Sequence, residues 1–278
     1  GWLPRLTRVT ARVPGLARIA NIVMSVAPLR SLAFRIIGLD PRRGMPALQS
    51  GTFTAWARRR NLLAGSVPAS ASSDPISGTR ERGGTTASSD SARERGGTTA
   101  SSDSAREREA ATASSMADSP ILSGPRDPGG RPYALVWADS FSQTLDDAGA
   151  RAVVDVLEAN GFAPIVAPDA CCGLTWITTG QLTGAKKHLT SLLSVLAPFA
   201  ASGIPIVGVE PSCTAVLRDD LLDLLPEDPR SALVSGATRT LAEALSVVPA
   251  SARRLPSLEG VEIVAQPHCH HYSVMGWD

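Results

Sequence analysis

The sequence is poor in aromatic residues and in cysteine. Phe, Trp and Tyr make up 4% of the 278 residues, and only four cysteines occur, too few for a disulfide scaffold. The longest charge-free apolar run near the start lies between Arg18 and Arg30, which is too short to span a bilayer, and no signal peptide is recognisable. We therefore expect a globular protein of a reducing compartment, the cytoplasm.

Several motifs with known chemistry are also missing. The sequence contains no Gly-x-Gly-x-x-Gly, no Gly-x-x-x-x-Gly-Lys-[Ser/Thr] and no Gly-x-Ser-x-Gly. The sequence therefore gives no basis for binding FAD, NAD or a nucleoside triphosphate, and it shows no hydrolase nucleophile. Cys-x-x-Cys is absent too, which excludes the spacing of ferredoxins and zinc ribbons.

Charge is unevenly distributed along the chain. The net charge is +1, but residues 1–60 hold eleven Arg and a single acidic residue, Asp40. Residues 133–278 hold eight Lys or Arg against sixteen Asp or Glu. A basic arm and an acidic body could attract each other, or the arm could serve an acidic partner. We expect no nucleic-acid partner.

The composition divides the chain into three parts: a basic helical arm (1–60), a low-complexity linker (61–131) and an α/β domain (132–278). In the linker the unit GGTTASSDSARER occurs twice in tandem, at 83–95 and 96–108, and it has nothing to bury. The linker is therefore predicted to be disordered.

The arm is predicted to form two or three short helices over 3–38, each starting near a proline, and an irregular segment over 39–60. Arg5, Arg8 and Arg12 recur at helical spacing. The favoured interpretation is the solvated face of a packing helix, and the alternative is a membrane-surface or subunit-docking helix.

The third part alternates strand and helix patterns, which predicts a doubly wound, mostly parallel sheet with flanking helices. The expected strands are 133–137, 162–166, 205–209 and 261–265, and the expected helices are 144–160, 181–201, 213–225, 228–234 and 237–247.

All four cysteines follow predicted strands, where open α/β sheets place their sites. They lie in Cys171-Cys172-Gly173, in Glu-Pro-Ser-Cys213 and in Pro-His-Cys269. Thiolates are soft ligands for iron–sulfur clusters or zinc, and Gly173 allows a strained turn close to a ligand. The alternative is that they are small buried apolar residues.

Other polar residues flank these cysteines. His268 is a candidate ligand beside Cys269, whereas His270 and His271 are expected in a polar loop. His188, alone in an apolar helix, is expected to be structural. Asp169 and Glu210 could tune or ligate a metal, or could equally cap helices.

Three segments resemble the cysteine-rich Cys-Cys-Gly domain of iron–sulfur oxidoreductases: APDACCGLTWITTGQL, IPIVGVEPSCTAVLRDDLLDLLP and AQPHCHHYSVMGWD. Relatives include the iron–sulfur component of glycolate oxidase, the cysteine-rich component of heterodisulfide reductase and fused FAD-linked dehydrogenases of D-lactate type. The resemblance covers about residues 133–278 well and 1–60 loosely.

The resemblance implies electron transfer from a flavin-linked D-2-hydroxy-acid dehydrogenase, through a 4Fe-4S type cluster, toward a quinone or a membrane-surface acceptor. FAD and a ferredoxin-like segment would belong to upstream domains, and the protein could lie at the inner face of the membrane. The implied cluster positions are Cys171, Cys172, Gly173, Cys213 and Cys269.

The sequence also departs from the family pattern, which has cysteines near Phe141 and at the position of Glu210 and a second Cys-Cys-Gly. Laying Leu135-Val136 on Ile263-Val264 suggests that a second copy of the unit begins near the end, so we expect a piece of a longer polypeptide that is inactive alone. The alternatives are a cluster-free docking domain and a zinc site that includes a histidine such as His268.

Overall fold

The structure is a computed structural model, which describes residues 2–13, 15–37, 40, 42, 47–65 and 124–276. For residues 2–6 and 37 it describes only the backbone. The tandem repeat and most of the predicted linker lie outside the described residues, as does the side chain of Arg5.

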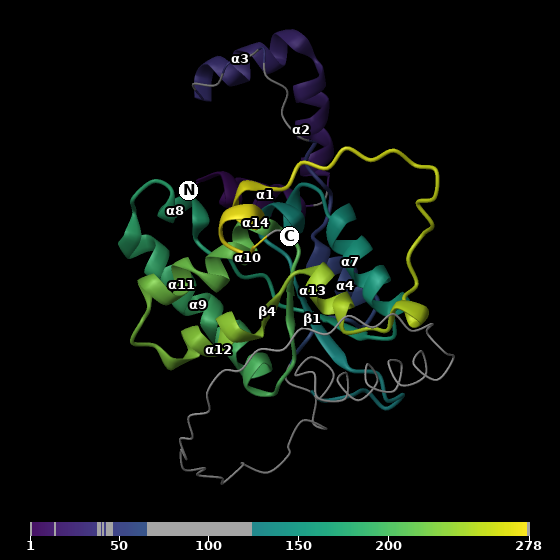
Figure 1. The fold of residues 1–278 in the computed structure, drawn as a ribbon. Helices are drawn as coiled ribbons and strands as arrows, with labels where there is room; N and C mark the ends of the chain where they lie inside the picture. Colours follow the sequence, from purple (N-terminus) through teal and green to yellow (C-terminus); the bar gives the residue numbers. More distant parts are fainter. Residues whose placement is uncertain are drawn as a thin grey trace, which may run out of the picture.

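The body is built on a four-stranded parallel sheet with the strand order β2-β1-β3-β4, which confirms the predicted α/β fold (Figure 1). In the central strand, Leu135 pairs with Ile165 on one side and with Ile206 on the other. The strands are β1 (Tyr133–Trp137), β2 (Ala163–Val166), β3 (Ile206–Gly208) and β4 (Thr238–Arg239).

Helices cover both faces of this sheet, because alternate side chains of a strand point to opposite faces. Leu135 and Trp137 belong to one core cluster, and Ala134 and Val136 to the other. The first cluster includes residues of α9 (Leu182–Ala201), α10 (Pro211–Arg218), α11 (Asp220–Leu224) and α12 (Pro229–Ala237). The second includes residues of α4 (Phe53–Arg59), α7 (Ala148–Ala159) and α13 (Leu241–Ser246).

Short helices follow several strands and loops: α6 (Ser140–Thr144), α8 (Leu174–Ile177), η2 (Ala250–Ala252) and α14 (Cys269–Ser273). Asp139 caps α6, because its side chain accepts hydrogen bonds from the backbone N–H groups of Phe141 and Ser142. The helix predicted over 144–160 corresponds to α7, which starts at Ala148, and α6 is a further helix that precedes it and ends at Thr144.

The arm forms α1 (Trp2–Arg12), α2 (Leu16–Ser25) and α3 (Ala27–Ile37), as predicted. The prediction of an irregular segment over 39–60 was wrong for residues 53–59, because Thr52 caps helix α4 there, whereas residues 40, 42 and 47–52 form no helix or strand. Beyond α4 the chain runs beside β2: the Ala64 N–H donates to Val166 O (2.9 Å), and the Val166 N–H donates to Leu62 O (2.7 Å). The chain just after the arm is thus joined to the edge of the sheet, so the prediction of disorder was wrong for residues 62–64 at the start of the linker.

The predicted strand over 261–265 was also wrong. No strand is assigned there, and Val264 is 99% exposed, so this segment has no neighbour to pair with. The fourth strand is β4, which lies earlier in the chain. Consequently Cys269 begins the short helix α14 and does not follow a strand.

The described part of the chain holds no single helix that is both long enough and apolar enough to cross a bilayer. Helices α2 and α3 meet these requirements only when taken together, and they are bent by 105° at the break between them.

Candidate functional site at the carboxyl edge of the sheet

Three loops meet at the carboxyl ends of the strands and line a cavity of about 180 Å³. They contribute residues after β1, β2 and β3: Asp139, Ser140, Phe141, Cys171, Cys172, Leu174, Thr175, Glu210, Ser212 and Cys213. From β1 the chain first forms β2 on one side of β1 and then β3 on the other side. Open parallel sheets form their crevice at such a change of direction, here between β1 and β3. The volume is below the ~300–1,000 Å³ typical of organic-ligand pockets, so a small inorganic group is the better match.

The Cys-Cys-Gly turn is fixed to the end of β1. The Ala167 N–H donates to Val136 O (2.9 Å), and the indole N–H of Trp137 donates to Ala170 O (3.1 Å). Gly173 then adopts a left-handed conformation with φ +79°, and a Cβ there would lie 3.1 Å from the Cβ of His188. The turn needs glycine both for its backbone angle and for its close packing against α9.

Two thiols from different loops are in contact. The Sγ atoms of Cys172 and Cys213 lie 3.1 Å apart, and the two residues are 3% and 9% exposed. Cys171 is partly buried beside them, and its Sγ accepts a hydrogen bond from the Gly173 N–H (3.4 Å). The predicted convergence of the vicinal pair with Cys213 is confirmed, whereas their role as ligands stays a prediction.

Glu210 is the N-cap of α10. Its carboxylate accepts hydrogen bonds from the Cys213 N–H (2.7 Å) and from the Ser212 hydroxyl (2.8 Å). Partial burial acts to raise the pKa of Glu210, but the hydrogen bonds from Cys213 and Ser212 outweigh it and lower the pKa. Of the two roles considered for Glu210, the structure therefore shows the helix cap, and it places a negative charge at the cavity wall.

The environment keeps the three thiols protonated. The hydrogen bond with Cys172, together with burial, raises the pKa of Cys171. For Cys172 the hydrogen bond with Cys171 acts in the lowering direction, but the hydrogen bond with Cys213 and burial raise the pKa. For Cys213 the hydrogen bond with Cys172 acts to lower the pKa, and burial and the charges of Asp139 and Glu210 outweigh it. A cationic group that binds here must therefore displace protons.

Arg8 of the arm contacts two residues beside the cysteines, Asp169 and Ser140. Its guanidinium donates to both carboxylate oxygens of Asp169 (3.0 Å each) and to the Ser140 hydroxyl (3.2 Å). Its side chain is 24% exposed, so Arg8 does not fit the expected solvated face, whereas Arg12, at 67%, does. Asp169 is the partner of Arg8 rather than a helix cap.

The histidine and cysteine cluster near the end of the chain stands outside the cavity. His268 caps α14 by accepting a hydrogen bond from the His270 N–H (3.2 Å), and its Nε2 lies 3.3 Å from the Ser212 hydroxyl. Cys269 is exposed and is not among the residues that line the cavity. His188 packs against the Trp176 ring with 4.0 Å between centroids, as a structural residue does.

Sequence reasoning missed Asp139 and Ser140, which are buried at 2% and 6% exposure and line the cavity. The available signal was an aspartate directly after a strand and before a helix, which is a common N-cap pattern.

The donor set suits a thiophilic group, since three sulfur atoms lie in one wall of the cavity. However, the residues described by the structure include no group of three or more His, Cys, Asp or Glu side chains arranged to hold a metal ion. Binding therefore requires a rearrangement of thiols that are already neighbours.

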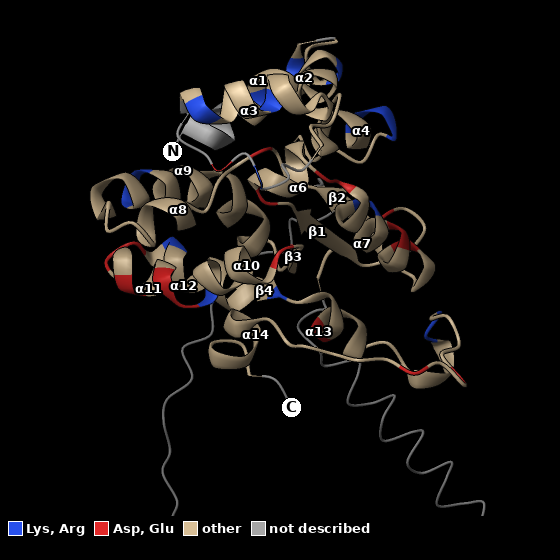
Figure 2. Cartoon of the chain, turned by 90° about the horizontal axis from the view of Figure 1, so that it is seen from above, with Lys and Arg blue, Asp and Glu red and all other residues tan. Residues whose placement is uncertain are grey.

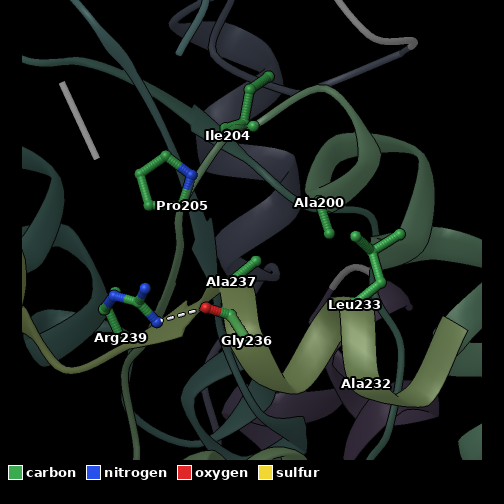
Figure 3. Close-up of a pocket in the computed structure, with 9 residues that line it drawn as sticks. Ala200, Ile204, Pro205, Ala232, Leu233, Gly236, Ala237 and Arg239 are labelled. Carbon is green, nitrogen blue, oxygen red and sulfur yellow. Dashed lines mark hydrogen bonds between the residues drawn. The ribbon is translucent and has the colours of Figure 1, made fainter. Parts of the chain in front are cut away.

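A second cavity, of about 290 Å³, lies at the opposite edge of the sheet (Figure 3). Its lining is mostly small and apolar, and its charged residue, Arg239, donates to the carbonyl oxygens of Gly236 (2.6 Å) and Thr238 (2.8 Å). It offers no nucleophile or acid among its lining residues, so we place the chemistry at the cysteine cavity.

Comparisons with protein-family models, with curated proteins and with solved structures found no match to this chain. Its function must therefore be inferred from the site. Phe141 and Glu210, near or at which the resemblance noted in the sequence would place further cysteines, both line the cavity with Cys171, Cys172 and Cys213.

Proposed function

We propose that Cys171, Cys172 and Cys213 hold an iron–sulfur centre and that the domain relays electrons. The observation that carries this proposal is the 3.1 Å contact between thiols from two strand ends in the wall of one small cavity. Support comes also from Phe141 and Glu210, because the family positions that lack cysteine here fall in the same cavity.

An iron–sulfur centre supplies one-electron transfer, and the chain supplies its surroundings. Burial of Cys172 and Cys213 keeps water from the sulfur atoms. The N-terminus of α10, with Cys213 in its first turn, sets the positive end of a helix dipole beside the sulfur atoms. The carboxylates of Asp139 and Glu210 oppose added negative charge, which favours the oxidised state and lowers the reduction potential.

The wider setting that we propose is a flavin-linked dehydrogenase of D-2-hydroxy acids such as lactate or glycolate. Its FAD domain and a ferredoxin-like domain would feed electrons to this site, and a quinone would receive them at the inner face of the membrane. This setting can be tested with the chain joined to such domains. On addition of D-lactate the joined protein should reduce a quinone analogue, and the absence of reduction would reject the setting.

Anaerobic reconstitution with ferrous iron and sulfide tests the site. The full chain should retain iron and acid-labile sulfide, and Cys172→Ser and Cys213→Ser should each lose most of both. Cys269→Ser is the matched control, because its thiol is exposed outside the cavity. A chain that retains no iron, or a control that loses as much as Cys172→Ser, rejects the proposal.

Variants that add thiol ligands provide a second test of the site. Glu210→Cys and Phe141→Cys place further sulfur in the cavity wall, so we expect each to raise the iron retained per chain. Phe141→Ser opens the same space without adding sulfur and should not raise it. Equal iron in Phe141→Cys and Phe141→Ser would show that position 141 does not face the centre.

Two alternatives remain as outcomes of the same measurements. Zinc that is retained by the chain and lost in His268→Ala would indicate a Cys/His zinc site, which the proximity of His268 to Ser212 makes worth testing. Metal-free protein whose melting is unchanged by a chelator would indicate a cluster-free docking domain.

A further inference from the structure

Helices α2 and α3 stand away from the sheet and its covering helices (Figure 1). Both carry exposed apolar side chains. Ile19 and Ile22 are three residues apart in α2, and Leu29, Leu32 and Ile36 recur at i, i+3 and i+7 in α3, as on one face of a helix; Val26 lies at the break between the two helices. We call this set the apolar ridge; it consists of Ile19 (61% exposed), Ile22 (56%), Val26 (40%), Leu29 (45%), Leu32 (59%) and Ile36 (76%).

The ridge is accompanied by positive charge only. Residues 16–37 contain Arg18, Arg30 and Arg35 and no acidic residue, and Arg18 and Arg35 are exposed. Figure 2 shows basic but no acidic positions on α2 and α3. The two helices therefore present apolar and cationic groups together.

The helical pair is held in place despite its exposure. Ala17 and Phe34 are 1% and 2% exposed. Asn21 donates to Leu48 O and accepts from the Leu48 N–H, both at 2.8 Å, which fixes α2 to the segment before α4. The ridge is thus presented by an ordered element.

The geometry of α2 and α3 favours a role at a membrane surface over a spanning one. Helices of ten and eleven residues are about 15–17 Å long, roughly half the ~30 Å hydrocarbon core, and the 105° bend prevents them from adding their lengths. An apolar stripe with arginines beside it suits the interface of a bilayer that contains anionic lipid. A second copy of the same ridge fits less well, since it would bring like charges together.

We propose that α2 and α3 dock the protein on an anionic bilayer surface, with the ridge in the interface and the arginines at the headgroups. This names the element that would meet the membrane in the proposed setting, but it is argued from α2 and α3 alone and does not depend on the thiol centre. Cys172→Ser should therefore lose iron and keep its lipid binding, so that the two proposals can fail separately.

Flotation of the full chain with lipid vesicles tests the proposal. The chain should float with vesicles of phosphatidylcholine and phosphatidylglycerol, much less with phosphatidylcholine alone, and less as salt is raised. The double variant Leu32→Glu/Ile36→Glu should bind about tenfold more weakly or worse, because apolar burial supplies much of the affinity. Arg18→Glu/Arg35→Glu should lose the preference for anionic vesicles.

The matched control is Leu258→Glu/Ile263→Glu, which changes two apolar residues that are 55% and 61% exposed elsewhere on the body. It should bind like the unaltered chain. Equal flotation with both kinds of vesicle, none with either, or equal loss in the control would overturn the proposal. So would light scattering that shows a dimer which Leu32→Glu/Ile36→Glu dissociates, since the ridge would then bind a second copy.

Discussion

At the scale of single residues, the backbone of Gly173 decides how the two cysteines meet Cys213. Gly173 and Gly180 share a positive φ, of +79° and +71°. A Cβ at Gly173 would also lie 3.1 Å from the Cβ of His188 and 3.4 Å from the Cα of Ala185, whereas nothing lies within 4 Å at Gly180. Alanine substitutions at Gly173 and Gly180 therefore separate two effects: both strain the backbone, but only the one at Gly173 also crowds α9.

We predict that Gly180→Ala lowers the free energy of unfolding by about 1–2 kcal/mol, the cost of a left-handed alanine. Gly173→Ala should cost about 1–3 kcal/mol more, because α9 must also give way. Urea unfolding of both variants measures the difference. Equal losses would mean that the Cys-Cys-Gly turn is not packed against α9.

The cysteines also show what single residues reveal in a sequence. The pair Cys171-Cys172 and Cys213 could be predicted to meet because each follows an apolar run, and parallel strands end at one edge. The contact between Arg8 and Asp169 could not be predicted from the sequence. It joins residues 161 positions apart and depends on how the whole of helix α1 packs. Glu210 was ambiguous, since a carboxylate after a strand suits a ligand and a cap equally.

At the scale of elements, α13 is joined to α10 through Glu243. Its carboxylate accepts hydrogen bonds from Arg218 (2.7 and 2.9 Å) and completes a capping box with Thr240. Partial burial acts to raise the pKa of Glu243, but the hydrogen bonds from Arg218 and from the Thr240 N–H outweigh it and lower the pKa.

We predict that Glu243→Gln lowers the free energy of unfolding at pH 7 by about 1 kcal/mol or less, because the carboxylate is 37% exposed and screened by solvent. Since the folded-state pKa is lowered, this stabilisation is present above the ordinary value of 4.5 and is lost as pH falls through the folded-state value. Urea unfolding should therefore show a difference at pH 7 that shrinks at lower pH. Glu259→Gln, at an exposed position, is the control, and a difference that does not depend on pH would contradict the assignment.

The strands β1, β2 and β3 were predicted correctly from their apolar runs, and α9 from its helical spacing of leucines. β4 was missed because Thr238-Arg239 is two residues long and not apolar. The segment 261–265 is mostly apolar and β-branched, as a strand often is, but its composition carries no information about a partner strand, and the structure provides none. Tertiary pairing, rather than local preference, decides both cases.

At the scale of the whole molecule, the arm is part of the body's core. Phe53 is 0% exposed and belongs to the cluster that includes Val154 and Leu157 of α7. From composition, residues 1–60 were predicted to be a separate basic arm. The eleven arginines dominate that composition, so it does not reveal which apolar residues pack into the core.

We predict that Phe53→Ala lowers the free energy of unfolding of the full chain by about 3–5 kcal/mol, as expected for a buried aromatic residue. Phe141→Ala, at a position that is 40% exposed, should cost less than about 1 kcal/mol. Both values come from urea unfolding followed by circular dichroism. A small effect at Phe53 would show that the arm folds apart from the sheet.

The iron X-ray absorption spectrum of the anaerobically reconstituted full chain tests the thiol centre most directly. We predict a first shell of sulfur with iron–iron scattering behind it, and the loss of both features in Cys213→Ser. A first shell of oxygen or nitrogen alone, identical in the unaltered chain and in Cys213→Ser, would contradict an iron–sulfur centre at this edge of the sheet.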